Sequence, residues 1–408
     1  MSVPAEGGGV PPLRIGVVAG EASGDQLGAG LIAALSAACP RARFEGVAGP
    51  AMRAAGCEAW EDAAALAVMG LVEPLAEIPR LLRLRRSLVR RWQAEPPAVF
   101  VGIDAPDFNL GLELALRRRG IPTVHYVSPT VWAWRAGRMR KIARAVDRVL
   151  CLFPFEKALY DRHGVPATFV GHPMADRFPF DLEREAERRR LGLAASRIVA
   201  VLPGSRASEV ARLGPVFAEA SRRLADAVDD IGFVAPMAGA ALRRTFEAQL
   251  AAAGVGAHYR LIDQGARSAL AAADVCLLAS GTAALEAALM ARPMVAAYRV
   301  APLTYLLARG LRLLKVRHIT LPNLLTPEPL VPELLQGAAT PAALADAVLS
   351  LLRDPDRRAF VEGEFAKLRG LLARGADREA ARAVLALAHG GSDPEKRLND
   401  DNSVGIPG

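Results

Sequence analysis

A carboxylate stands directly after an apolar run in the first half of the chain. Asp104 follows Ala98–Ile103, a run typical of a buried parallel strand. Ligands of open α/β sheets bind at the carboxyl ends of the strands, and a carboxylate near an apolar loop can be desolvated there. Asp104 is therefore a candidate general base. Asp107, three residues later, is more typical of a helix cap than of a catalyst.

The second half of the chain carries residues suited to holding phosphate. Leu202-Pro203-Gly204-Ser205-Arg206 passes from an apolar run through a glycine turn into a predicted helix. Backbone amides at a helix start, together with a guanidinium, favour bound anions. This pattern predicts a phosphate cradle at Gly204, Ser205 and Arg206, although a plain strand-to-helix turn would look similar. It is not a P-loop, because the chain has no GK[ST] sequence.

A second turn of the same kind follows in this half. Ser280-Gly281-Thr282 again offers backbone amides between an apolar run and a helix, and Glu286 lies on the first turns of that helix. A carboxylate in this place could bind ribose hydroxyls, and among Ala and Leu it is costly without a partner. Leu321-Pro322-Asn323 is a further candidate loop.

Two more clusters in the first half could line a site. Gly20-Glu21-Ala22-Ser23-Gly24-Asp25 follows the first apolar run, where Ser23 and Gln26 have the spacing of a capping box. Trp132 and Trp134 stand beside Arg135 after another predicted strand, and could line a sugar or acyl site or simply pack in the core.

An apolar segment followed by arginines suggests a lipid surface. Its apolar members are Val68, Met69, Leu71, Val72 and Leu75. Six arginines and no acid follow between residues 80 and 91, including Arg85 and Arg86. Apolar and basic residues side by side predict docking to an anionic membrane. An ordinary arginine-rich surface helix is the alternative.

Composition narrows the class of protein. The 408 residues are 52% hydrophobic and 23% charged with a net charge of +8, which indicates a globular chain whose partner is anionic. No apolar run is long enough to span a membrane, and the N-terminus lacks the features of a signal peptide. Four scattered cysteines predict free thiols rather than a metal site or disulfides. Asp354-Pro355-Asp356 is typical of helix capping rather than of metal binding, so we expect no metal and no cofactor.

Alternating apolar runs and helical patterns must position these residues. They predict two Rossmann-like, doubly wound α/β domains facing a central cleft. We expect a first domain over residues 13–180, a second over 191–352 and closing helices over 353–389, with disorder at 1–12 and 390–408. The expected strands are Leu13–Ala19, Phe44–Ala48, Ala98–Ile103, Thr123–Val127, Arg148–Phe153, Thr168–Val170, Ile198–Leu202, Gly232–Pro236, His258–Leu261, Asp274–Ala279 and Met294–Tyr298.

The ordered set of motifs resembles the lipid A disaccharide synthase family, bacterial inverting glycosyltransferases with the two-domain GT-B fold. The carrying segments are Gly20–Asp25, Gly102–Asn109, Ser128–Trp134, Gly171–Pro173, Leu202–Arg206, Ser280–Glu286 and Leu321–Asn323. Each motif alone is weak, but their order along residues 13 to 388 is specific. The resemblance implies a hexosyltransferase that joins UDP-2,3-diacylglucosamine to 2,3-diacylglucosamine 1-phosphate by a β-1,6 bond and releases UDP, in lipopolysaccharide synthesis.

The resemblance also implies roles for single residues. Arg206, Glu286 and Asn323 would bind UDP, with Gly204, Ser205 and the Ser280-Gly281-Thr282 turn. Asp104 would be the base and Glu21 its rival. Ser23, Asp107, Trp132 and Trp134 are expected near the acceptor lipid. The substrates carry acyl chains, so the enzyme is expected in the cytoplasm, peripherally attached to the inner membrane.

Two alternatives remain at this point. The first is another GT-B transferase, such as the one that adds N-acetylglucosamine to peptidoglycan precursors. Its first turn is rich in successive glycines, whereas this chain has Gly20-Glu21-Ala22-Ser23-Gly24. The second is a basic, non-catalytic binder of nucleic acid or membranes. The carboxylates Glu21, Asp104 and Glu286 argue against nucleic acid, because they would repel its phosphates.

Overall fold

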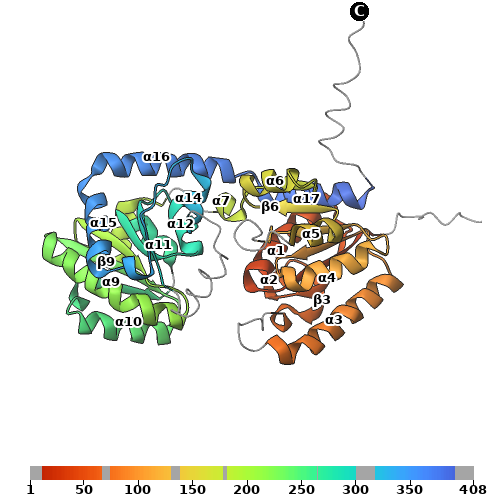
Figure 1. Ribbon diagram of the computed structural model, residues 1–408, viewed down its shortest axis with the longest axis horizontal. Coiled ribbons are helices and arrows are strands. Elements are labelled where there is room, and N and C mark those ends of the chain that lie inside the picture. Colours follow the sequence, from red (N-terminus) through yellow and green to blue (C-terminus); the bar gives the residue numbers. More distant parts are fainter. Residues whose placement is uncertain are drawn as a thin grey trace, which may run out of the picture. The chain divides into compact units, whose positions relative to one another are not determined.

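The computed structural model contains two compact units (Figure 1). Unit 1 comprises Met1–Pro173 and Arg374–Gly408, and unit 2 comprises Met174–Ala373. The structure describes residues 12–66, 74–129, 138–177, 182–263, 265–299 and 318–390, with side chains of the second range from residue 78 onward.

Unit 1 is built on a sheet of seven parallel strands in the order β3-β2-β1-β4-β5-β6-β7. These strands are β1 Arg14–Ala19, β2 Arg43–Ala48, β3 Cys57–Asp62, β4 Val99–Ile103, β5 Thr123–Tyr126, β6 Arg148–Cys151 and β7 Ala167–Phe169. The helices of unit 1 are α1 Ala22–Ala38, α2 Pro50–Ala54, η1 Ala63–Ala65, α3 Pro74–Ala94, α4 Pro106–Arg117, α5 Arg138–Ala145, α6 Pro154–Asp161, α7 Pro173–Arg177 at the boundary with unit 2, and α17 Ala376–Ala388.

Unit 2 repeats this plan with six parallel strands in the order β10-β9-β8-β11-β12-β13. Its strands are β8 Arg197–Leu202, β9 Ile231–Met237, β10 Tyr259–Asp263, β11 Val275–Ala279, β12 Met294–Tyr298 and β13 Glu333–Leu335. The helices are α8 Arg184–Leu191, α9 Ala207–Ala227, α10 Ala240–Ala252, η2 Gly256–His258, α11 Ala266–Ala272, α12 Thr282–Leu289, α14 Leu321–Leu325, η3 Gln336–Ala338, α15 Pro341–Arg353 and α16 Pro355–Leu372.

The two parallel sheets confirm the predicted doubly wound α/β class. Their strands are apolar runs because helices cover both faces of such sheets. The sequence reading missed β3 and β13. β3 carries three acids and is only half-buried at the sheet edge, and β13 has three residues, so neither shows an apolar run.

The core of unit 1 packs around Trp92 of α3. Its indole ring is fully buried, with its centroid 5.0 Å from that of Phe100 on β4. The indole nitrogen donates to Glu45 Oε1 on β2 at 3.2 Å, so the buried polar atom is satisfied. α3 is therefore fixed against the sheet through its C-terminal half, while its opposite face stays available.

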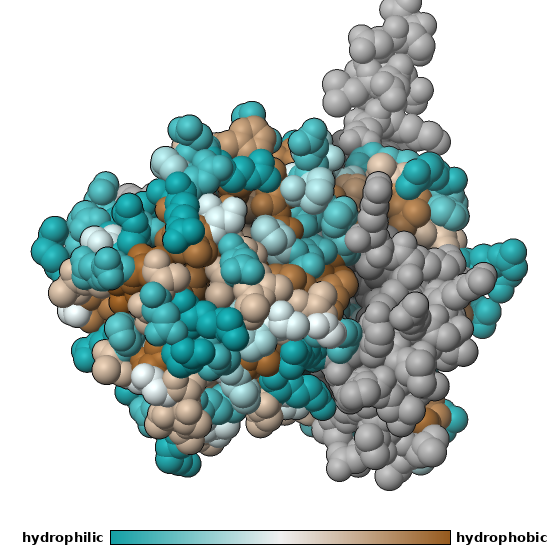
Figure 2. All heavy atoms as spheres, turned by 60° about the vertical axis from the view of Figure 1, so that its left-hand side comes forward, coloured by the Kyte–Doolittle hydropathy of each residue, from teal (hydrophilic) through white to brown (hydrophobic). Residues whose placement is uncertain are grey.

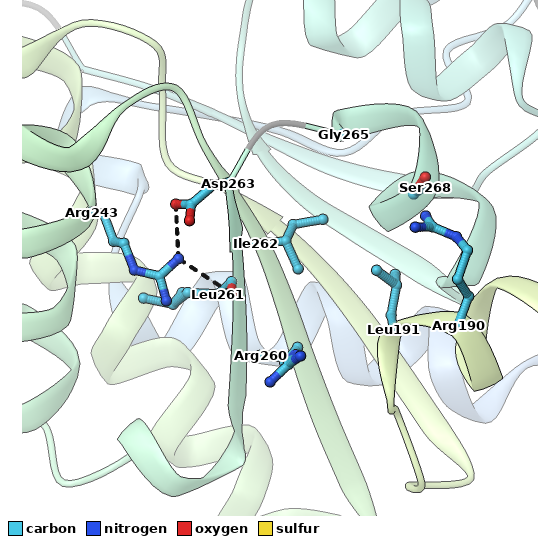
Figure 3. A pocket seen from close by; sticks show the side chains of 9 residues that line it. All are labelled: Arg190, Leu191, Arg243, Arg260, Leu261, Ile262, Asp263, Gly265 and Ser268. Carbon is cyan, nitrogen blue, oxygen red and sulfur yellow. Dashed lines mark hydrogen bonds and ion pairs between the residues drawn. The ribbon is translucent and has the colours of Figure 1, made fainter.

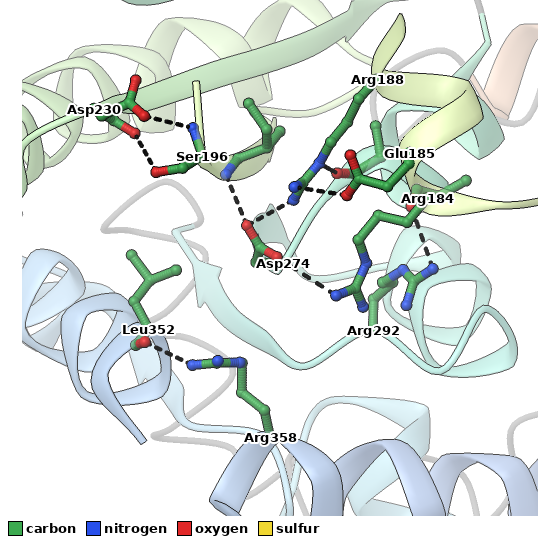
Figure 4. A network of polar contacts seen from close by, with 12 residues as sticks. Arg184, Glu185, Arg188, Ser196, Asp230, Asp274, Arg292, Leu352 and Arg358 are labelled. Atoms are coloured by element: carbon green, nitrogen blue, oxygen red, sulfur yellow. Dashed lines mark hydrogen bonds and ion pairs between the residues drawn. The ribbon is translucent and has the colours of Figure 1, made fainter. Parts of the chain in front are cut away.

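A buried charge network lies at the amino ends of two central strands of unit 2, β8 and β11 (Figure 4). Asp274, just before β11, accepts from Arg188 Nη2 of α8 and from the Ile198 amide of β8, both at 2.8 Å. Arg184 contacts Asp274 at 3.5 Å and Glu362 of α16 at 3.1 Å. The network lies where these strands begin, so it serves stability and leaves their carboxyl ends to bind ligand.

The last two helices belong to different units. α16 packs on α12 and α15 of unit 2, whereas α17 packs on α1 and β4 of unit 1. Asp354 caps α16, where its Oδ1 accepts the Arg357 amide at 2.8 Å, which confirms helix capping at Asp354-Pro355-Asp356.

Among the described residues, no helix is both long and apolar enough to cross a lipid bilayer. On the face drawn in Figure 2, hydrophilic residues are interleaved with hydrophobic ones. All four cysteines are free thiols, as predicted, and burial raises the pKa of Cys57 and Cys276 to about 12.

Candidate functional site

Each sheet reverses its strand order at one place. In unit 1 the reversal lies between β1 and β4, and in unit 2 between β8 and β11. Parallel strands end at the same edge, and the turns that leave a reversal point diverge to opposite faces, which opens a crevice for ligand. The residues predicted to do chemistry follow these four strands: Glu21 after β1, Asp104 after β4, Gly204–Arg206 after β8 and Ser280–Thr282 after β11.

A hollow of about 620 Å³ lies at the reversal point of unit 2. It is lined by the turn after β8, the turn after β11 and Glu286 of α12. The structure thus brings together the predicted UDP-binding residues Gly204, Ser205, Arg206, Ser280, Gly281, Thr282 and Glu286. Asn323 is not among the residues that line it.

The turn after β8 differs from the predicted phosphate cradle. Glu209 Oε2 accepts the Ser205 amide at 2.9 Å and the Arg206 amide at 3.2 Å. Two amides of the predicted cradle are thus already satisfied by an internal carboxylate. The missed signal is the spacing from Arg206 at the helix start to Glu209 three residues later, which is that of a capping box.

Arg206 itself remains available to a ligand. Its side chain is 81% exposed, and its Nη1 lies 3.8 Å from Glu209 Oε1. A contact at this distance between exposed groups is weak, so the guanidinium can turn to an anion in the hollow at little cost.

The turn after β11 offers unpaired amides. α12 has Gly281 as its N-cap, and no side chain caps it. The Ser280 amide donates to Ala297 O at 2.9 Å, whereas the amides of Thr282 and Ala283 have no partner among the described residues. Unpaired amides and the partial positive charge of a helix start favour a bound anion. The start of α12 is therefore suited to holding an anion.

Glu286 is half-buried on the wall of the hollow. Burial raises the pKa of its carboxyl, and the positive charge of Arg267 opposes that rise. A partly desolvated carboxylate beside open space is a strong acceptor for hydroxyl groups.

Asn323 has a structural role in unit 2. Its Nδ2 donates to Val331 O at 2.8 Å and to Glu333 Oε1 at 2.9 Å, and its Oδ1 accepts the amides of Leu330 and Val331. Both donors and the acceptor are engaged, which leaves the buried amide no capacity for a direct UDP contact. The sequence placed Asn323 in a candidate loop without showing that this loop would consume the side chain.

At the reversal point of unit 1, the two turns touch. Asp104 and Ala105 both have positive φ, 51° and 42°, a conformation that costs free energy in residues other than glycine. A Cβ on Gly20 would lie only 2.5 Å from Ala105 Cβ, so a glycine is required where the turn after β1 meets the turn after β4. Strain at Asp104 is consistent with a functional position, because surrounding contacts must hold it.

Asn109 holds this strained turn. Its buried Nδ2 donates to Asp104 O at 2.8 Å and lies 3.3 Å from both Ile103 O and Val18 O. One amide thereby joins the ends of β1 and β4 under the candidate base. Sequence reading quoted Asn109 in a motif but assigned it no role.

A buried acid–imidazole pair lies beneath the same turn. Glu113 Oε1 is 2.7 Å from His125 Nδ1, and neither side chain is exposed. Burial raises the pKa of Glu113, while His125 opposes the rise. Gly102 gives this pair room, because a Cβ there would overlap Glu113 Oε1. The pair ties α4 to β5 and does not reach the surface.

Other predicted residues of unit 1 are placed as follows. Glu21 is the exposed N-cap of α1, so the capping box predicted at Ser23 is wrong, and Ser23 lies exposed in the first helical turn. Asp25 is instead buried and accepts the amides of Gly49, Ala51 and Met52. The cap predicted at Asp107 is also wrong, because Ala105 is the N-cap and Asp107 forms an ion pair with Arg138.

Several predictions fall outside the described residues. Trp132 and Trp134 lie there, as do Val68, Met69, Leu71 and Val72, and Leu75 belongs to α3 without a described side chain. Arg85 and Arg86 are described, half-buried and exposed respectively. Within the described ranges no group of three or more His, Cys, Asp or Glu residues has the arrangement of a metal site.

Comparison with known proteins covers nearly the whole chain. Residues 15–386 match the family described as lipid-A-disaccharide synthetase. The chain is 54% identical over 381 residues to a lipid-A-disaccharide synthase of Alkalilimnicola ehrlichii, covering 93% of this chain and 99% of that one. It is also 54% identical to the Sodalis glossinidius synthase, covering 92% and 98%.

Solved structures share the fold at low sequence identity. A UDP-N-acetylglucosamine 2-epimerase described as putative, from Listeria monocytogenes, has a TM-score of 0.59 at 15% identity and covers 92% of this chain and 95% of its own. The glycotransferase of kitacinnamycin has a TM-score of 0.58 at 18% identity, covering 92% and 99%. Two α/β units with parallel sheets, as in these proteins, are the GT-B arrangement.

Proposed function

The chain belongs to the lipid-A-disaccharide synthetase family and is a hexosyltransferase of lipid A biosynthesis; from this premise we propose how its two units divide the reaction. Unit 2 binds the sugar nucleotide, and unit 1 binds the acceptor and supplies the base. The observation that carries the proposal is the hollow of about 620 Å³ in unit 2, which joins a free helix start, an exposed arginine and a half-buried carboxylate.

The donor is UDP-2,3-diacylglucosamine. Its diphosphate binds at the start of α12 and to Arg206, where amides and a guanidinium balance the negative charge. Glu286 accepts the ribose hydroxyls. Gly204 and Ser205 form the wall beside Arg206, with their turn closed by Glu209. Asn323 acts by holding the loop after α14 rather than by touching UDP.

The acceptor is 2,3-diacylglucosamine 1-phosphate, whose 6-hydroxyl attacks C1 of the donor sugar. The base takes the hydroxyl proton, the new O–C1 bond forms with inversion, and the bond from C1 to the diphosphate breaks. The electron pair leaves with UDP, and Arg206 and α12 stabilise the added negative charge.

The base is Asp104, which the strained turn holds at the end of β4. Glu21 at the start of α1 is the alternative base. Ser23 and Asp107 lie near these carboxylates in sequence and are assigned to the acceptor side, together with Trp132 and Trp134.

Both substrates carry acyl chains, so the enzyme meets them at a lipid surface. We place the contact on the segment of Val68, Met69, Leu71, Val72 and Leu75 and on the arginines of α3, including Arg85 and Arg86. The arginines would attract anionic lipid and the apolar side chains would insert. The enzyme then works peripherally at the cytoplasmic face of the inner membrane.

The experiment is a reconstitution with the full chain and both lipid sugars. UDP release should require the acceptor and should equal the disaccharide formed, with a β-1,6 bond by NMR. Equal rates with N-acetylglucosamine 1-phosphate, which lacks the long acyl chains, or an α bond, would contradict the substrate assignment. The control is the Asp104→Asn protein, which should bind UDP but release it from the donor about 10²–10⁴-fold more slowly.

A further inference from the structure

Unit 1 has a concave region between α3 and α4. It is a hollow of about 400 Å³. Its walls carry the arginines Arg85, Arg86, Arg90 and Arg119 with the apolar residues Val89 and Ala115. None of the described residues that line it is a carboxylate. Four guanidinium groups around one small space are a strong attractor for an anion.

The charges of this groove are uncompensated. Arg85, Arg86 and Arg90 form no ion pair within the part of the chain that the structure describes. Arg119 donates only to neutral oxygens, to Gln93 Oε1 at 3.1 Å and to Ala115 O at 2.7 Å. Among the described residues, no carboxylate therefore pairs with these four positive charges.

Another hollow, beside β10 in unit 2, provides a contrast (Figure 3). Two of its three arginines are paired: Arg243 with Asp263 at 2.9 Å and Arg190 with Glu187 at 2.6 Å. Only Arg260 has no ion pair among the described residues. The dashed lines in Figure 3 show Arg243 turned to Asp263. Arginines already neutralised by carboxylates gain little from a further anion, so the α3–α4 groove is the better anion site.

The groove is shaped, and not only charged. Arg85 lies over Gly111 of α4, and a Cβ on Gly111 would overlap its Nη1. A glycine inside a helix costs about 1 kcal/mol relative to alanine, and here it lets the guanidinium rest on the helix backbone. Burial, followed by the charge of Arg86, lowers the pKa of Arg85. Arg85 is thus held in place among like charges, a cost that a bound anion would remove.

We propose that the α3–α4 groove binds the phosphate group of an anionic membrane lipid. This inference rests on the proposed membrane contact and specifies its partner. A guanidinium matches phosphate oxygens in a bidentate manner, and Val89 and Ala115 offer an apolar wall to the rest of a lipid headgroup. Nucleic acid is the less suitable ligand, because it is held by an extended row of phosphate contacts and these arginines surround a single hollow.

The first test measures sedimentation of the full chain with phosphatidylcholine vesicles, with and without phosphatidylglycerol. Arg86→Ala combined with Arg90→Ala should weaken binding to phosphatidylglycerol vesicles about fivefold for each arginine, about 25-fold in all. The matched control removes two exposed arginines of unit 2, Arg189→Ala with Arg244→Ala. It should leave vesicle binding within about twofold of the unchanged chain. Equal losses of vesicle binding in both double variants would mean that only net charge matters. That result would overturn the proposal that the groove binds lipid.

The second test changes shape at constant charge. Gly111→Ala displaces the Arg85 guanidinium, which can move because it is the end of a flexible side chain, and alanine strengthens the helix. Vesicle binding should fall about fivefold, the share of one arginine, with no drop in the melting temperature. Unchanged binding would overturn the proposal.

The outcomes separate the groove from the membrane contact on which it rests. If the unchanged chain fails to bind phosphatidylglycerol vesicles, the membrane contact itself is wrong. If it binds, and every groove variant binds equally well, the contact stands and the groove is wrong. Calorimetric titration with inorganic phosphate forms a third arm. Tight phosphate binding that the double variant loses, without vesicle binding, would make this a site for free phosphate and overturn the lipid assignment.

Discussion

The two reversal points, between β1 and β4 in unit 1 and between β8 and β11 in unit 2, share one topology and carry opposite chemistry. In unit 1 the turns meet at Gly20 and Ala105 and present the carboxylates of Glu21 and Asp104. In unit 2 they stand apart around a hollow of about 620 Å³ and present amides and Arg206.

The contrast shows how one fold divides a transfer reaction. A parallel sheet supplies turns at a shared edge, and the residues in those turns decide whether the edge accepts protons or binds anions. Internal carboxylates sharpen the division. In unit 2, Glu209 takes up the Ser205 and Arg206 amides in the turn after β8. In unit 1, Asp25 takes up amides at the start of α2, whereas Glu21 and Asp104 are the candidate bases.

The largest effect is expected for the base of unit 1. Asp104→Asn keeps the size and the Asn109 contact, which involves the backbone carbonyl, but cannot accept a proton. We expect kcat to fall about 10²–10⁴-fold while UDP affinity stays unchanged, measured by steady-state kinetics and calorimetry. Glu21→Gln is the matched comparison. If the Asp104→Asn variant has a near-normal kcat and the Glu21→Gln variant is inactive, Glu21 is the base.

The next effect tests the cation of unit 2. Arg206→Ala removes a charge-assisted contact to the diphosphate worth about 2–3 kcal/mol, so kcat/KM for the donor should drop about 30- to 150-fold. Arg212, exposed on the same helix and remote from the hollow lining, supplies the control. Arg212→Ala should behave like the unchanged enzyme. Equal losses in both variants would point to the general positive field rather than a contact.

A smaller effect is expected at the carboxylate of unit 2. Glu286→Gln should weaken UDP binding, measured by calorimetry, about tenfold, because a charged acceptor of hydroxyls becomes neutral.

The same Glu286→Gln change should also raise the free energy of unfolding at neutral pH. Burial raises the pKa of Glu286, so ionisation costs folding free energy above that pKa and costs nothing well below the ordinary glutamate value. Thermal melts at about pH 7 and pH 4 should show the gain only at pH 7; the same gain at both values would refute it.

The smallest effect tests the closed turn. Glu209→Ala frees the amides of Ser205 and Arg206 and should cost about 1 kcal/mol, which lowers the melting temperature by about 2–4 °C. Glu209→Gln keeps an acceptor oxygen and should restore most of the loss. If the alanine variant melts normally, the capping contacts do not stabilise the turn.

Local sequence patterns predicted most of the helices and strands, because apolar runs and helical periodicity are visible in short stretches of sequence. The strands that escaped detection, β3 and β13, are edge strands, whose residues need no continuous apolar run. Helix starts at Ser23 and Asp107 were misread because residues typical of a helix cap also occur within the first helical turn. Both helices begin one or two residues earlier, without a side-chain cap.

The amino-acid sequence by itself determined the family, the two α/β units and the strand ends at which polar residues would gather. Only the tertiary structure decided what those residues are free to do. Arg206 and Glu286 line the hollow of unit 2. The side-chain amide of Asn323 is hydrogen-bonded to the loop after α14, and the Glu209 carboxylate is hydrogen-bonded to the turn after β8. The physical reason is that a side chain's capacity for hydrogen bonds is finite, and partners distant in sequence consume it only once the chain has folded.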